Sequence, residues 1–212
     1  MKNKLAAYVA SCLIGTALLA SPAFASNHTN DENSPWLVRV RALGVLPETS
    51  GSSVSTLGGS LKISNQVTPE LDISYFFTKN IAAELVLATV RHEVRATTGN
   101  TDLGNVWLLP PTLTAQYHFD TGTRFKPYLG AGVNYTHFYN ETPGATNNVH
   151  YKNTFGPALQ VGTDVKITDH WVFNLDVKKV YIRPDVSVNH GAITSNAHID
   201  PWLVGVGFGY RF

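Results

Sequence analysis

The chain has little sulfur and little excess charge. One Cys and one Met occur among 212 residues, and both lie near the N-terminus, at Cys12 and Met1. Beyond residue 25 there is therefore no thiol chemistry to consider. No later window offers ~18 consecutive apolar residues, which excludes a helical membrane protein. The formal charge is +1, with 16 basic and 15 acidic residues, which gives no reason to expect nucleic-acid binding.

The N-terminal segment is typical of a secretory signal peptide. Lys2 and Lys4 form a basic region, residues 5–20 are apolar, and the small residues Ala-Phe-Ala precede a predicted cleavage between Ala25 and Ser26. Cleavage would remove both lysines, so that the formal charge becomes +1 − 2 = −1. We expect two parts, a cleaved signal peptide and a single domain: residues 1–25 and 26–212.

The last stretch of the chain alternates strictly with period 2. One face is small or charged, and the other is large and apolar with aromatics at both ends: Trp202, Val204, Val206, Phe208, Tyr210 and Phe212. Aromatic rings prefer the two interfaces of a bilayer, so the pattern favours a strand that crosses a membrane.

Seven further segments repeat this alternation: 36–43, 70–77, 81–90, 112–119, 126–138, 157–167 and 171–182. Three connections are short, at 78–80, 120–124 and 168–170. Four are long and rich in Gly, Ser, Asn and Thr, at 44–69, 91–110, 139–154 and 183–198. Short turns on one rim and long loops on the other predict an all-β fold: an eight-stranded antiparallel transmembrane barrel of the outer-membrane type, with periplasmic turns and extracellular loops.

The chain also resembles a known family. Its final aromatic strand looks like the assembly signal of bacterial outer-membrane barrels, with Tyr210 and Phe212 as the recognition residues. The "DPW" before that strand resembles the OmpW family, as do "LGGSLKISNQ", "NIAAELVLAT", "LPPTLTAQYHF" and "KPYLGAGVNYTHF" in this order. The resemblance implies a Gram-negative outer-membrane protein, inserted by the barrel-assembly machinery. It also implies a narrow, apolar-lined barrel for uptake of small hydrophobic molecules.

Ten charged residues fall on the predicted inner face: Arg39, Arg41, Glu70, Asp72, Glu84, Asp164, Lys166, Asp176, Lys178 and Arg211. An eight-stranded barrel is about wide enough inside for side chains alone, which rules out a wide diffusion pore. We interpret these charges as a structural ion-pair network that neutralises the lumen. An ion path along them is the alternative.

Six apolar residues share the inner face and form the candidate lining for hydrophobic solutes, although simple core filling is an alternative: Phe76, Val86, Phe138, Val172, Val180 and Leu203. Prolines cannot donate to a strand ladder, so Pro110, Pro111 and Pro157 mark places where the wall is expected to be loosely paired. A solute could leave sideways there into the lipid. The alternative is that these prolines only mark strand starts.

The eight His residues show no metal-ligand spacing on one strand face, and no motif places a nucleophile beside a base. A weak surface site at His190 and His198 with Asp185 and Asp200 is the only metal candidate. We therefore expect no enzyme, no cofactor and no metal, and predict a narrow channel for passive uptake of small hydrophobic molecules. The alternative is a plugged structural or receptor-type barrel whose loops bind lipopolysaccharide or partners.

Overall fold

The computed structural model describes seven stretches of the chain: residues 34–48, 53–54, 61–96, 101–144, 148–188, 193–196 and 198–212. The predicted signal peptide and its cleavage site at Ala25 and Ser26 lie outside the described residues. No helix that is long and apolar enough to cross a membrane is present in the described part of the chain.

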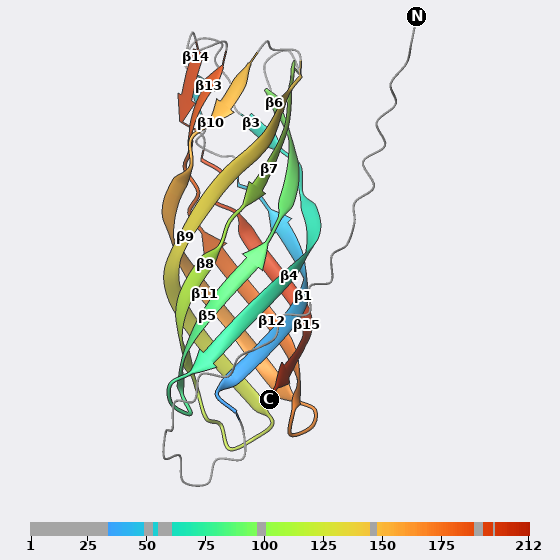
Figure 1. Ribbon diagram of the computed structural model, residues 1–212, viewed down its shortest axis with the longest axis vertical. Coiled ribbons are helices and arrows are strands. Elements are labelled where there is room, and N and C mark those ends of the chain that lie inside the picture. Colours follow the sequence, from blue (N-terminus) through green and yellow to red (C-terminus); the bar gives the residue numbers. More distant parts are fainter. Residues whose placement is uncertain are drawn as a thin grey trace, which may run out of the picture. The chain divides into compact units, whose positions relative to one another are not determined.

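Eight antiparallel strands form a closed barrel, as predicted (Figure 1). Each is hydrogen-bonded to the next, including the fifth to the sixth, and the pairing of the first strand with the last closes the ring. In order around the wall they are β1 (Trp36–Leu46), β4 (Gln66–Phe76), β5 (Ile81–Ala88), β8 (Thr112–His118), β9 (Phe125–Pro143), β11 (Thr154–Lys166), β12 (Trp171–Val180) and β15 (Trp202–Arg211).

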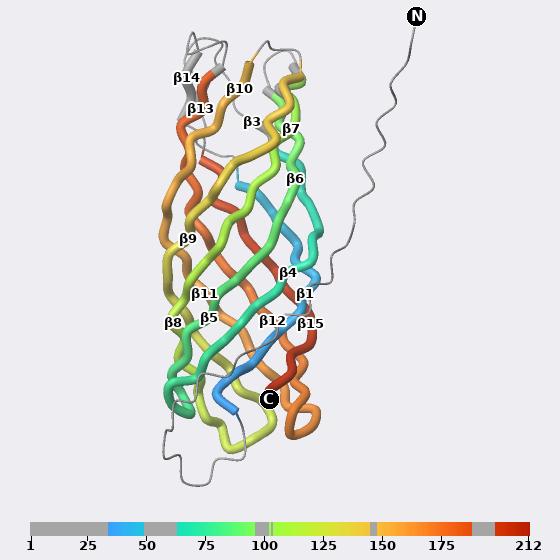
Figure 2. Tube along the Cα trace, viewed as in Figure 1, coloured from blue at the N-terminus to red at the C-terminus, as the bar shows by residue number. Residues whose placement is uncertain are grey.

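The segments predicted as long loops contain seven more strands, which corrects that prediction. Strands β6 and β7 pair with each other and continue the wall upward, with β3 along the edge of β6 (Figure 2). A separate four-stranded sheet has the order β10-β13-β14-β2. The bounds are β2 (Ser53–Val54), β3 (Leu61–Ile63), β6 (Val90–Ala96), β7 (Thr101–Leu109), β10 (Val149–Tyr151), β13 (Asp185–Val188) and β14 (Ile193–Asn196).

Strand β6 escaped prediction because its outward face is polar. In β6 the inward residues His92 and Val94 are buried, whereas Glu93 and Arg95 on the opposite face are exposed. A strand that stands above the lipid needs no apolar outer face, so the alternation that identifies a membrane-crossing strand is lost.

The predicted inward and outward faces are confirmed for the membrane-crossing strands. In β1, Arg39 and Arg41 are buried while Trp36 and Val40 are exposed. The inner face of the neighbouring strand β15 is small, which leaves room for the long side chains of β1. A Cβ on Gly205 would lie 3.1 Å from Cδ of Arg41.

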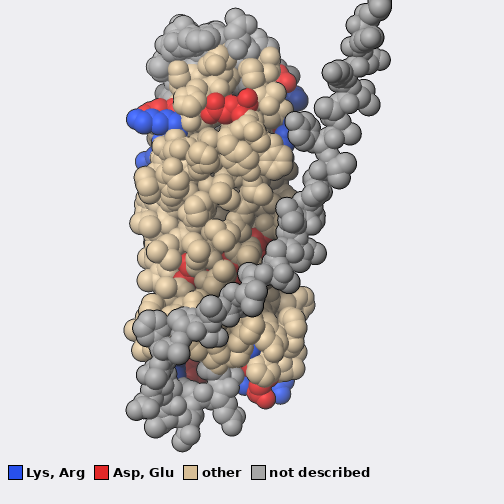
Figure 3. Space-filling view, in the orientation of Figure 1, with Lys and Arg blue, Asp and Glu red and all other residues tan. Residues whose placement is uncertain are grey.

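Two aromatic girdles mark the edges of the membrane-facing band. The lower girdle lies near the short turns and includes edge-to-face pairs such as Trp171 with Tyr210, at 5.3 Å between ring centroids. The upper girdle includes Tyr135 with Phe155, at 4.6 Å. Figure 3 shows charged side chains gathered near the two ends of one face, with a mostly uncharged surface between them in which a few acidic atoms are visible. This distribution is what a barrel in a bilayer requires.

Candidate functional site

The middle of the barrel lumen is filled by a buried ion-pair network. Arg39 pairs with Asp164 at 2.6 Å and with Glu84 at 2.9 Å. Arg41 lies 2.7 Å from a Glu70 oxygen, and Lys178 lies 2.7 Å from Asp176. Eight of the ten charged residues predicted for the lumen meet here, all of them buried: Arg39, Arg41, Glu70, Asp72, Glu84, Asp164, Asp176 and Lys178.

Neutral side chains complete this network. The Tyr128 hydroxyl donates to Asp176 at 2.7 Å, and the Gln160 amide donates to Glu84 at 2.9 Å and to Asp176 at 2.7 Å. Asn174 donates to Asp164 at 2.9 Å. The lumen is therefore occupied at this height by bonded polar side chains, and opening it would leave buried charges without partners, at a cost of several kcal/mol.

The other two predicted lumen charges lie elsewhere. Lys166 is partly exposed and pairs with Asp169 in the short turn after β11, at 2.9 Å. Arg211 lies at the periplasmic end, where its Nε donates to the Ser34 carbonyl and its guanidinium lies 4.3 Å from the centroid of the Phe76 ring. These contacts place Lys166 outside the central network, which corrects the prediction for Lys166, and place Arg211 at the periplasmic end of the lumen.

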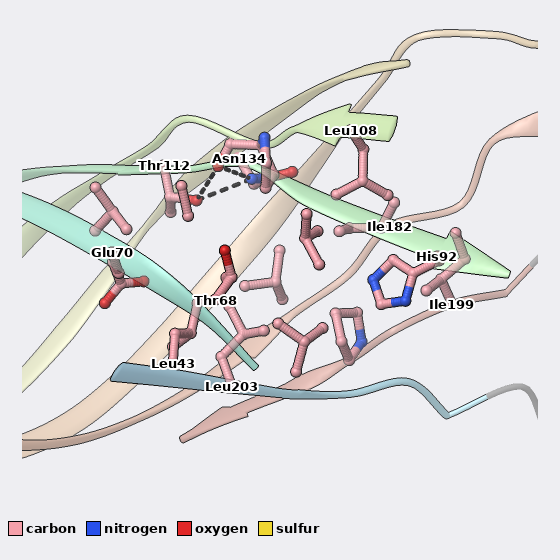
Figure 4. Close-up of a pocket in the computed structure, with 17 residues that line it drawn as sticks. Leu43, Thr68, Glu70, His92, Leu108, Thr112, Asn134, Ile182, Ile199 and Leu203 are labelled. Atoms are coloured by element: carbon pink, nitrogen blue, oxygen red, sulfur yellow. Dashed lines mark hydrogen bonds between the residues drawn. The ribbon is translucent and has the colours of Figure 1, made fainter. Parts of the chain in front are cut away.

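Above the network the lumen contains an apolar cavity of about 30 Å³ (Figure 4). Glu70 lies at one end of the lining, next to the network, and His92 and Ile199 lie at the opposite end. The remaining wall is mostly aliphatic, with Leu43, Val45, Ala88, Val90, Leu108, Val180, Ile182 and Leu203. A volume of this size holds about two to three waters, so any larger solute needs side chains to move.

The structure separates the six residues predicted as apolar lining into two groups. Val86, Val180 and Leu203 line the cavity. Phe138 belongs to the same upper cluster and stacks on Tyr151, at 5.4 Å between centroids. The other two lie below the ion pairs, in a small cluster with Leu37 and Ala82: Phe76 and Val172. The charged network thus divides what the sequence suggested to be one continuous lining.

The barrel wall beside the cavity is interrupted at Pro110 and Pro111. The β5–β8 ladder ends at Val86 and Thr112, and the β6–β7 ladder begins at Val90 and Leu108. Residues 87–89 and 109–111 have no paired register between these two ladders in the described structure. The Asn134 side chain donates to the carbonyls of both prolines, at 3.0 and 3.3 Å. Asn134 thus provides hydrogen bonds where the ladder fails.

Pro157, the third predicted exit residue, lies in a continuous wall. It pairs in register with Val133 of β9, and its carbonyl accepts a hydrogen bond from the Tyr181 amide at 3.0 Å. The expectation of loose pairing at Pro157 is wrong, because a proline at a position that needs no N–H donor does not disturb the ladder.

Sequence reasoning did not find the upper end of the cavity, which includes His92. Its Nδ1 lies 2.8 Å from the Ser64 carbonyl. Burial lowers the pKa of His92, and the hydrogen bond with Ser64 only partly opposes this effect, so the ring is neutral at neutral pH. A neutral imidazole is compatible with an apolar cavity.

No metal centre is formed by the described residues. Of the four residues named as a surface metal candidate, His190 lies outside the described part. Asp200 is engaged by Arg183, at 2.9 Å, and by the backbone amide of Ile182, at 3.0 Å.

A closed eight-stranded barrel with short turns at one rim, extended loops at the other and two aromatic girdles defines the class of bacterial outer-membrane barrels. The relatives of the chain are also named as outer-membrane proteins. The chain is 49% identical over 184 residues to the uncharacterized outer-membrane protein y4mB of Sinorhizobium fredii, covering 84% of this chain and 80% of the relative. It is 34% identical over 215 residues to outer membrane protein W of Escherichia coli, covering 95% and 97%.

A solved structure supports the same assignment. The crystal structure of the outer membrane protein OprG from Pseudomonas aeruginosa matches with a TM-score of 0.77 and 27% identity, covering 85% of this chain and 97% of OprG. A sequence model described as the OmpW family matches residues 32–212. The chain belongs to the OmpW family, which confirms the predicted family and the outer-membrane location.

Proposed function

We propose that the protein is a narrow channel for passive uptake of small hydrophobic molecules across the outer membrane, and that it is not an enzyme. The observation that carries this proposal is the position of the apolar cavity. The cavity lies directly above the buried charges and directly beside the interruption in the barrel wall. An apolar solute is favoured in the cavity and disfavoured in the network below it.

The ion pairs make a straight path to the periplasm unfavourable. A solute that followed the barrel axis would have to separate pairs such as Arg39–Asp164 and Lys178–Asp176, which are buried. Removing one partner of a buried pair costs about 3–5 kcal/mol, and several pairs stand in the way. The path proposed here turns sideways before it reaches them.

The interruption in the wall offers a sideways exit at a low cost. Ala88 and Pro110 line the cavity on the two sides of the unpaired stretch. Because Asn134 already binds the proline carbonyls, few backbone hydrogen bonds need to break when the strands separate there. Thr89 bridges to the Tyr139 hydroxyl at 2.6 Å and donates to the Leu108 carbonyl at 3.4 Å, and these contacts would have to open.

One observation favours a different function, that of a plugged barrel whose extracellular loops bind lipopolysaccharide or partners. The lumen is blocked by the ion pairs, and the cavity of about 30 Å³ is small. Uptake distinguishes the two functions. A channel must accelerate the entry of an apolar solute, whereas a plugged barrel must not.

The test uses cells, since an apolar solute crosses a simple phospholipid bilayer by itself and only the lipopolysaccharide leaflet resists it. Cells that lack an OmpW-family protein, with and without this chain, are exposed to a small apolar fluorescent dye. We expect the chain to raise the rate of dye entry. Leu203→Phe, which fills the cavity, should lower that rate several-fold.

The matched control is Val172→Phe. It adds the same ring on the inner face of the adjacent strand β12, but in the cluster below the ion pairs. Rates are normalised to the amount of folded barrel, measured by its altered gel mobility before heating. Equal loss in both variants, or no difference between cells with and without the chain, would contradict the channel.

A further inference from the structure

We infer that the cavity selects solutes that carry a cationic hydrogen-bond donor, such as a primary ammonium group, at the end of a short apolar body. This inference rests on the proposed function and specifies its substrate class. Two features of the lumen support it: an acceptor without a partner at the lower end of the cavity, and an excess of negative charge beneath it.

The acceptor is Oε2 of Glu70. Glu70 is 1% exposed and lines the cavity at its lower end (Figure 4). Its other oxygen, Oε1, lies 2.7 Å from Arg41 Nε and accepts from Lys178 Nζ at 3.2 Å. Oε2 accepts no hydrogen bond from any described residue. A buried acceptor that lacks a donor is costly, and a solute that supplies one removes this cost.

The polar side chains near Glu70 are already bonded. The Asn134 side-chain nitrogen donates to Pro110, Pro111 and Thr112, and the Thr68 hydroxyl donates to the Thr89 carbonyl at 2.7 Å. The Thr112 hydroxyl donates to the Pro110 carbonyl at 3.1 Å. Glu70 is therefore the charged group in this cavity with unused capacity to accept, and the other acceptor, Nε2 of the neutral His92 ring, lies at the opposite end.

The charge below the cavity decides which donor is preferred. Among the described residues, the network contains five carboxylates and three cations: Glu70, Asp72, Glu84, Asp164 and Asp176 against Arg39, Arg41 and Lys178. The formal excess is two negative charges. In a medium of low dielectric constant this excess attracts a positive charge far more strongly than it would in water. A positively charged donor therefore gains more at Oε2 than a hydroxyl does, and a carboxylate is repelled.

The shape of the cavity defines the rest of the solute. The wall above Glu70 is aliphatic on all sides, from Leu43 and Val86 up to Ile182 and Ile199. An unbranched alkyl chain matches the chemistry of this wall once side chains move to admit it, with its ammonium group at Glu70 and its tail towards His92.

The experiment compares three six-carbon probes that differ only in the head group: 1-aminohexane, 1-hexanol and hexanoate. Each is titrated into the purified full-length barrel in lipid nanodiscs, with the backbone amide resonances of Val86, Asn134 and Leu203 as reporters. We expect 1-aminohexane to bind about tenfold or more tightly than 1-hexanol, which is about 1.4 kcal/mol. Hexanoate should bind most weakly.

Two variants at Glu70 and one control test the assignment. Glu70→Gln keeps the shape and an acceptor but removes the charge, and it should abolish the preference for the amine. Glu70→Asp keeps the charge beside Arg41 and Lys178 but withdraws the carboxylate from the cavity, and it should reduce the preference. Glu70→Asp provides the test by itself if Glu70→Gln does not fold. The control, Thr68→Val, removes a polar group from the same wall and should retain the preference.

Equal binding of the three probes to the wild type, or an amine preference that survives in both Glu70 variants, would overturn the inference. In that case the apolar-dye assay with Leu203→Phe still decides the proposed function by itself. If no probe shifts the cavity resonances and no dye enters cells, the inference and the channel both fail.

Discussion

Lys179 and Leu175 lie on the outer face of the same strand, and the structure predicts opposite sensitivities for them. Lys179 pairs across the ladder with Trp202 of the upper girdle, and Leu175 pairs with Val206. Trp171 marks the lower girdle on this strand. At ~3.3 Å per residue and ~40° tilt, Leu175 lies about 10 Å above Trp171 and Lys179 about 20 Å above it. The apolar band is ~25 Å tall, so Leu175 lies near its centre.

The surroundings of Lys179 show that its charge is already satisfied. Its side chain is 13% exposed, its Nζ lies 2.6 Å from a Glu48 oxygen, and it donates to the Asp200 carbonyl at 2.6 Å. Nζ also lies 4.8 Å from the centroid of the Trp202 ring. The ammonium therefore turns towards the upper rim, as a lysine near a membrane interface does. Glu48 supplies the negative charge that the ammonium meets there.

We expect Leu175→Lys to destabilise the barrel by ~2–4 kcal/mol, the cost of a lysine near the bilayer midplane. Lys179→Leu loses an ion pair at the rim, worth ~0–1 kcal/mol, and a cation–π contact of ~0.5–1 kcal/mol. Urea titration of both variants in lipid vesicles measures the difference. Comparable losses would show that the height assigned to these residues, or the outward facing of Leu175, is wrong.

Three further predictions concern assembly, the ion pairs and pH. Phe212→Asp should lower the amount of folded barrel in outer-membrane fractions, and unchanged levels would argue against a C-terminal assembly signal. Arg41→Met should cost ~3–5 kcal/mol in urea titration, because it leaves several buried carboxylates without their cation, and a loss below ~1 kcal/mol would refute this. Hydrogen bonds from Lys179 and Trp202 lower the pKa of Glu48. A carboxyl group whose pKa is lowered by folding stabilises the folded state above its unfolded pKa of about 4.3, and this contribution is lost as the pH falls through the folded pKa. The difference in unfolding free energy between wild type and Lys179→Leu should therefore narrow in acid.

Much of the barrel could be predicted because a strand has a period of exactly two residues. Once Val40 faces lipid, Arg39 and Arg41 must face the lumen, and the same parity places Glu84 and Asp176 inside. This reasoning gives the face of each residue but not its height. It therefore placed Phe76 and Leu203 in one lining, although the ion pairs separate them.

The candidate site could be predicted only in part, because it depends on pairings between strands that are distant in sequence. The break at Pro110 and Pro111 was indicated by the prolines themselves, which cannot donate to a ladder. The same rule was wrong for Pro157, where no donor was needed. Whether an oxygen of Glu70 lacks a hydrogen-bond partner depends on where the Arg41 and Lys178 side chains lie in space. No pattern along the chain encodes those positions.

The central claim is that an apolar solute leaves the barrel sideways between Pro110 and the strand that carries Ala88. The most direct measurement is dye entry into cells that carry Pro110→Val with Pro111→Val, which restores two N–H donors and allows the ladder to close. Pro157→Val is the control, since the wall there is already continuous. The account predicts that the double variant loses most of the uptake per folded barrel while the control retains it. Full uptake by the double variant would contradict the sideways exit.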